Sequence, residues 1–175
     1  MSTTIHRMTL KHILRNLHGT NILEVTCHNS GFMEDIQQLS ITTVNDFCGG
    51  DQWDTLILHM LERDMIQRVL KTAHSGTAGR ILILQHNSWS PDFWRHRQTY
   101  KNILSKSHLI KLCAQQGFTV TTVDHVVIVP NLFRRLKFLR AIEKYVFEIP
   151  ENILRHTPLR VFSRNLIAVI DIDYE

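Results

Sequence analysis

Short, strongly apolar segments alternate along this chain with segments of helical periodicity, and this alternation constrains the fold more than any other feature. The segment "RILILQH" is the clearest, an apolar run suited to burial on both faces of a sheet. The expected strands of the first half are residues 22–27, 40–44, 53–61 and 80–86, and the expected helices are residues 32–39, 64–74 and 107–116. Short connections between such elements predict an α/β fold with a mostly parallel sheet covered by helices on both faces.

The two ends of the chain complete this picture. Residues 1–20 are expected to contain an amphipathic helix that ends at Gly19. Two long strands, at residues 118–129 and 164–174, are expected to form an antiparallel pair at the sheet edge. A helical insertion at residues 130–150 separates them. Since the sequence shows no repeat or linker, the 175 residues are interpreted as a single domain.

Composition narrows the class of protein. A hydrophobic fraction of 43% supports a proper core, and no apolar stretch approaches the roughly eighteen residues of a membrane span. The N-terminus also lacks the apolar region of a secretory signal. The three cysteines, Cys27, Cys48 and Cys113, have unrelated spacings, which favours free thiols and a cytoplasmic location. The eleven histidines show no zinc-ligand spacing, so no metal is predicted.

The formal net charge of +4 permits weak attraction to acidic partners. No nucleic-acid-binding motif accompanies it, so contact with nucleic acid is not expected. The helix expected at residues 130–147 has a basic face that would suit a membrane surface. Glu143 and Glu148 dilute its charge, and packing over the sheet is the preferred interpretation.

Four segments, taken in order, resemble the class I S-adenosylmethionine-dependent methyltransferases, in the branch that acts on small molecules. "ILEVTCHNSGF" is similar to the cofactor loop, and "WDTLILHMLE" to the fourth strand and its turn. "GRILILQHNSWS" resembles the glycine turn and fifth strand, and "LIKLCAQQGFTVTTV" the helix before the final hairpin. The resemblance covers residues 21–174 and implies a Rossmann-like fold, with S-adenosylmethionine as the cofactor if there is one.

The cofactor loop departs from the family pattern, which is E/D-x-G-x-G-x-G. The corresponding positions here are Glu24, Thr26, His28 and Ser30, so only the acidic residue is retained. Gly31 is the one glycine left in the turn. Side chains at the other positions would stand where the backbone must approach the cofactor, which makes the segment look like a remnant of the loop.

Relative to the family, the sequence is also shorter by one β-α unit. Only twenty residues separate Phe32 from Trp53, enough for one helix and one strand where the family has two of each. Residues 40–44 resemble the later of the two family strands, which would place Asp46 beside the adenine. The carboxylate that grips the ribose, at the end of the earlier strand, then has no counterpart.

The resemblance implies cofactor contacts for Glu24, Gly31 and Asp46. His59 sits where the turn after the family's fourth strand faces the cofactor, and it is the candidate general base because imidazole titrates near neutrality. The alternatives are a polar strand-end residue at Glu24 and a hydrogen-bonded structural histidine at His59.

A substrate pocket is expected after the strand at residues 80–86. Open parallel sheets bind ligands outside the carboxyl ends of their strands. The residues that would line the pocket mouth there are His86, Asn87, Trp89 and Trp94. The alternative is that both tryptophans pack a lid helix onto the core.

Two functions remain open. The first is a degenerate methyltransferase-like domain that serves as a binding or scaffolding subunit, without methyl transfer of its own. It would act with a protein partner or by self-association, because a lost β-α unit exposes apolar sheet surface. The second is an active methyltransferase on a small molecule, with a rebuilt cofactor loop, His59 as base and the acceptor beside Trp89 and Trp94.

Overall fold

The computed structural model describes residues 3–26, 40–44, 47, 52–73, 79–93, 103–127 and 149–172. The strands are β1 (Asn21–Thr26), β2 (Ser40–Val44), β3 (Thr55–His59), β4 (Arg80–Asn87), β5 (Ile103–Leu104), β6 (Thr122–Val126) and β7 (Asn165–Asp171). The helices are α1 (Thr3–Asn16), α2 (Arg63–Ala73), α3 (Lys106–Gln115) and α4 (Ile149–Arg155), with 3-10 turns η1 (Pro91–Phe93) and η5 (Pro158–Phe162).

These strands form one sheet in the order β2-β1-β3-β4-β7-β6, with the short β5 paired to β4. The pairs among β2, β1, β3, β4 and β5 are parallel, whereas β7 runs antiparallel to both β4 and β6. The predicted α/β class, with a mostly parallel sheet and a C-terminal antiparallel pair, is confirmed.

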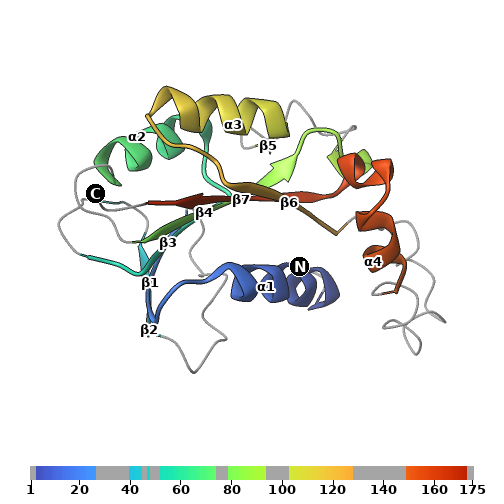
Figure 1. The fold of residues 1–175 in the computed structure, drawn as a ribbon, viewed down its shortest axis with the longest axis horizontal. Coiled ribbons are helices and arrows are strands. Elements are labelled where there is room, and N and C mark those ends of the chain that lie inside the picture. Colours follow the sequence, from blue (N-terminus) through green and yellow to red (C-terminus); the bar gives the residue numbers. More distant parts are fainter. Residues whose placement is uncertain are drawn as a thin grey trace.

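Two apolar layers cover the sheet, one on each face. Helices α2 and α3 pack on one face, and α1 lies on the other (Figure 1). Strand residues alternate between them: Leu56 and Leu58 of β3 face α2 and α3, whereas Ile57 joins the α1 layer. Every one of these positions is buried, which explains the continuous apolar runs in the sequence.

One inference about the missing β-α unit is wrong. Strand β2 pairs directly with β1, from Asn21 opposite Ser40 to Val25 opposite Val44. In doubly wound sheets the strand beside the first is the second, and the third lies further out. Residues 40–44 therefore take the place of the family's second strand and not of the later one. Asp46 then follows the strand that carries the ribose-binding carboxylate in the family.

Other elements differ in extent from their predictions. Strand β6 begins four residues later than the predicted strand at 118–129 and ends at Val126, where the left-handed backbone of Val127 (φ 61°) interrupts the extended run. The elements β5, α4 and η5 were not predicted. The helices predicted at 32–39 and 130–147 lie outside the described residues. No helix in the described part of the chain is long and apolar enough to cross a membrane.

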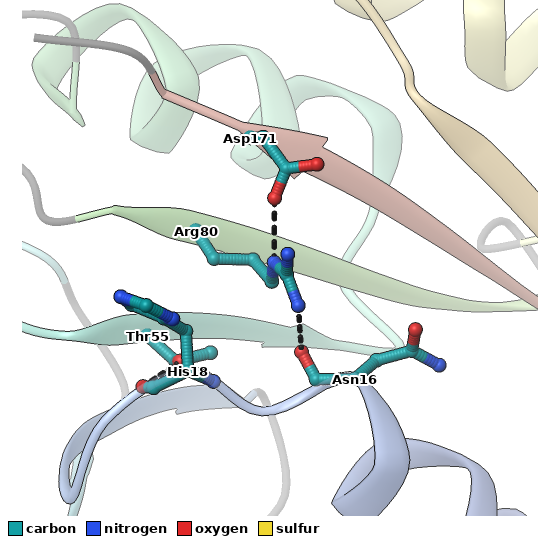
Figure 2. A network of polar contacts seen from close by, with 5 residues as sticks. All are labelled: Asn16, His18, Thr55, Arg80 and Asp171. Atoms are coloured by element: carbon teal, nitrogen blue, oxygen red, sulfur yellow. Dashed lines mark hydrogen bonds and ion pairs between the residues drawn. The ribbon is translucent and has the colours of Figure 1, made fainter.

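Polar contacts at the amino ends of β3 and β4 tie α1 to the sheet. Arg80 Nε donates to Asp171 Oδ1 at 2.6 Å, and Arg80 Nη1 donates to the Asn16 carbonyl at 3.1 Å (Figure 2). The Thr55 hydroxyl bonds both the amide and the carbonyl of His18, at 2.9 and 2.6 Å. This network fixes the connection from α1 to β1 at the edge opposite the carboxyl ends of β1, β3 and β4.

Candidate functional site

The carboxyl ends of β1 and β3 bring Glu24 and His59 together. The two strands are parallel neighbours, with Thr26 opposite His59 in register. His59 Nδ1 lies 2.9 Å from Glu24 Oε1, and the side chains are 8% and 0% exposed. A carboxylate removed from water in this way requires a close polar or charged partner. The pair therefore accounts for the presence of a glutamate inside an otherwise apolar strand.

The residue after His59 has an unusual backbone. Met60 is buried and adopts a left-handed conformation with φ 53°, which non-glycine residues rarely take. Its amide donates to the Leu84 carbonyl at 2.9 Å, so the turn is held against β4. Strained backbone of this kind is concentrated at functional sites, and here it fixes the exit from β3 beside the imidazole.

Asn87, the last residue of β4, forms hydrogen bonds through both the nitrogen and the oxygen of its side-chain amide. Its Nδ2 donates to the carbonyls of Val161 and Ser163, both at 2.8 Å, and approaches Ser163 Oγ at 3.2 Å. Its Oδ1 accepts from the Trp89 amide at 3.1 Å. The side chain is 1% exposed. These contacts use the amide to hold two chain segments together.

His86 contacts the start of β7 and an aromatic ring. Its Nδ1 lies 3.0 Å from Asn165 Oδ1, and its ring centroid is 4.4 Å from that of Phe93. The guanidinium of Arg164 lies 5.2 Å from the centre of the same Phe93 ring. Phe93 is buried, so the 3-10 turn η1 is anchored over the end of β4.

The other predicted site residues are Trp89, which the structure describes, and three residues that it does not describe. Trp89 is 54% exposed, so it is not a core residue. Trp94, Gly31 and Asp46 lie outside the described residues. Glu24, His59, His86 and Asn87 all lie at the carboxyl ends of neighbouring strands, at one edge of the sheet. That Glu24, His59, Asn87 and Trp89 converge around one cavity stays a prediction.

A buried polar network beside Asn87 was missed in the sequence. Ser163 Oγ lies 3.0 Å from His125 Nδ1 and donates to the Asn165 carbonyl at 3.2 Å, while Asn165 Nδ2 approaches Thr9 Oγ1 at 3.4 Å. Burial, with the positive charges of Lys106 and Arg160, lowers the pKa of His125 to about 4. The only sequence signal was a set of polar residues flanking the last strand.

Metal ligation finds no support in the side chains that the structure describes. Within those residues no group of three or more His, Cys, Asp or Glu side chains is arranged to hold a metal ion. The Glu24–His59 pair alone supplies too few ligands for a structural zinc site.

Comparison with known proteins finds similar solved structures but no match by sequence. No family model and no curated protein matches the sequence. An S-adenosylmethionine-dependent methyltransferase from Thermotoga maritima is similar in structure, with a TM-score of 0.59, 12% identity and coverage of 96% of this chain and 91% of that chain. The magnesium protoporphyrin IX methyltransferase of Synechocystis, solved with bound SAH, has a TM-score of 0.56, 11% identity and coverage of 97% and 84%.

A third neighbour is a chain from a Haloferax volcanii complex between a methyltransferase activator and a methyltransferase. It has a TM-score of 0.57, 12% identity and coverage of 97% of this chain and 91% of that chain. At such low identity these matches show the fold alone. The chain has a methyltransferase-like fold.

Proposed function

We propose that this chain is a methyltransferase-fold protein that does not transfer methyl groups itself and works as a binding subunit of an assembly. The observation that carries the proposal is the carboxyl end of β1. Thr26, fully buried, stands where the family has the first glycine of its cofactor loop. Glu24, the one loop residue that matches the family, is fully buried against His59.

The fit of S-adenosylmethionine can be judged from these two residues. The family's glycine has no Cβ, so its backbone can approach the cofactor closely, whereas Thr26 places a branched side chain at that point. The Glu24 carboxylate is engaged by an imidazole 2.9 Å away. The residues present therefore do not fit the cofactor in the family's manner, and no step of methyl transfer is derived for this chain.

The sheet edge supports a role in assembly. Among the described strands, β2 pairs only with β1, so its other side is a strand edge where the family has a further strand. Unprotected edges tend to be covered by another chain or segment. The Haloferax volcanii neighbour comes from a complex with an activator protein, which is a precedent for a methyltransferase fold that works beside a partner.

The second candidate is an active methyltransferase, and two observations favour it. The pairing of β2 with β1 puts β2 in the place of the family's ribose-type strand, and Asp46, two residues after it in the sequence, is the candidate for the ribose carboxylate. Glu24 Oε1 also lies 2.9 Å from one ring nitrogen of His59, and a carboxylate beside an imidazole is the pairing found where a histidine acts as a base. His59 would then act as the base toward an acceptor.

Thermal unfolding in the presence of S-adenosylhomocysteine separates the two candidates. A ligand at 100 times its dissociation constant stabilises the folded state by about 2.7 kcal/mol. For a chain of this size that raises Tm by about 5–11 °C. We expect no shift at 1 mM ligand, and a shift of this size would favour the active enzyme.

A further inference from the structure

We propose that the chain binds an acidic segment of a protein partner, one with apolar anchor residues, on the surface formed by the turn after β4 and the η5 turn. This surface, called the Trp89 surface below, consists of Trp89, Leu159, Arg160, Val161 and Phe162. The inference rests on the proposed function, because it names the partner chemistry of the binding subunit.

The Trp89 surface is apolar and open. Trp89 is 54% exposed, and the apolar residues of η5 are exposed by 51% (Leu159), 39% (Val161) and 37% (Phe162). No residue of η5 is buried. Single exposed apolar residues are ordinary, whereas a group of them on one surface marks an interaction site. Tryptophan and arginine are also the residue types most enriched among those that dominate binding energy in protein interfaces.

Asn87 holds the two halves of this surface in one geometry. Its amide nitrogen donates to the Val161 carbonyl in η5, and its oxygen accepts from the Trp89 amide. The two turns lie side by side at the end of the sheet (Figure 1). Because Asn87 is itself buried, the backbone that carries the Trp89 surface is held in place before a partner binds.

The Trp89 surface carries a positive charge at Arg160, which is exposed. The stretch from residue 153 to residue 164, "ILRHTPLRVFSR", contains three arginines and no acidic residue. Of these, Arg155 contacts His12 and Arg164 lies over the Phe93 ring, so Arg160 is the one that faces a partner.

Lys106, at the start of α3, and Arg160 both lie close enough to lower the pKa of His125, which burial lowers first, and their two positive charges outweigh the single opposing charge of Asp124. A partner that brings carboxylates around its apolar anchors would complement this surface, and a basic partner would be repelled.

The same charges argue against two other occupants. In a dimer with twofold symmetry, the Trp89 surface of one copy would face the Trp89 surface of the other. The positively charged Arg160 residues of the two copies would then lie in the same interface. The chain's own segment at residues 131–147 carries five basic residues and one acidic residue, Glu143, so it cannot supply the negative charge. The acidic protein segment is the occupant that the charges favour.

The test is a selection from a library of random 16-residue peptides displayed on phage, with the full chain immobilised. Recovered peptides are counter-selected on the double variant Trp89→Ala/Phe162→Ala and then synthesised for anisotropy titration. The matched control is Ile110→Ala, an exposed apolar residue on α3 outside the Trp89 surface. Parallel sedimentation assays use phosphatidylcholine vesicles with 30% phosphatidylserine.

We expect the recovered peptides to be net acidic with aromatic or aliphatic anchors. Their affinity should fall at least tenfold in Trp89→Ala and in Arg160→Glu, and should be unchanged in Ile110→Ala. Peptides without net negative charge, or with affinity that survives Arg160→Glu, would overturn the proposal. Vesicle binding that depends on Trp89 in the absence of any acidic peptide would overturn it in favour of a lipid surface. Cofactor binding, in contrast, would contradict the proposed function and leave the peptide result untouched.

Discussion

Replacing Asn87 by alanine should destabilise the fold strongly, because this buried side chain holds the turn after β4 and the η5 segment together. The substitution removes three well-formed hydrogen bonds, two to carbonyls at 2.8 Å and one from the Trp89 amide at 3.1 Å. Each contributes about 1 kcal/mol net, and the Ser163 carbonyl, left buried without this bond, adds about 1–2 kcal/mol. The expected loss in the free energy of unfolding is therefore about 3–5 kcal/mol.

Urea unfolding followed by far-UV circular dichroism measures this loss, with the free energy extrapolated linearly to water. In thermal unfolding the variant should melt about 6–20 °C lower. Trp89→Ala is the matched control two residues away: because that side chain is half exposed, its cost should stay within about 0.5 kcal/mol. If the free energy of unfolding of Asn87→Ala is within about 1 kcal/mol of the wild-type value, the structural role of Asn87 is refuted. A role for Asn87 in a substrate pocket would then be the better explanation.

Three further predictions are tested by unfolding measurements and by chemical labelling of a cysteine. Gly19→Ala should cost about 2 kcal/mol or more, since Gly19 has φ +67° and a Cβ there would meet the Asp54 side chain, whose carboxylate accepts the amides of Thr20 and Asn21. Burial, with the charge of Arg155, lowers the pKa of His12 to about 4, and that of His125 is lowered to about 4 as well. The unfolded chain then binds more protons between pH 6.5 and 4, so stability is full above pH 6.5 and should fall by about 2 kcal/mol per histidine toward pH 4; a flat profile would contradict these assignments. Cys113 is buried and its pKa is raised to about 12 by desolvation, so iodoacetamide at pH 8 should leave it unmodified in the native protein, as mapped by mass spectrometry.

Local sequence signals predicted several strands and helices closely. The β-branched segment at residues 40–44 is β2, with the predicted bounds, and the apolar run at 80–86 is β4 with one residue more. Helix α3 begins one residue earlier than predicted because Ser105 caps it by accepting from the His108 amide.

Features that depend on contacts between residues far apart in the sequence could not be predicted from local patterns. The neighbour of β2 in the sheet depends on pairing across the chain, which is why its family position was misassigned. Helix α4 and η5 contain Pro150 and Pro158 and show no clear apolar period, so nothing marked them as helical. The contacts of Asn87 lie 74 and 76 residues away along the chain, and no spacing rule connects such partners.

Calorimetric titration of the full chain with S-adenosylmethionine tests the central claim most directly. Thr26 has a side chain where the family has a glycine, and Glu24 is buried against His59. We therefore expect no dissociation constant tighter than about 100 μM, which corresponds to a binding free energy weaker than about 5.5 kcal/mol. A micromolar constant, abolished by Asp46→Ala, would contradict the account and establish that the chain has kept a working cofactor site.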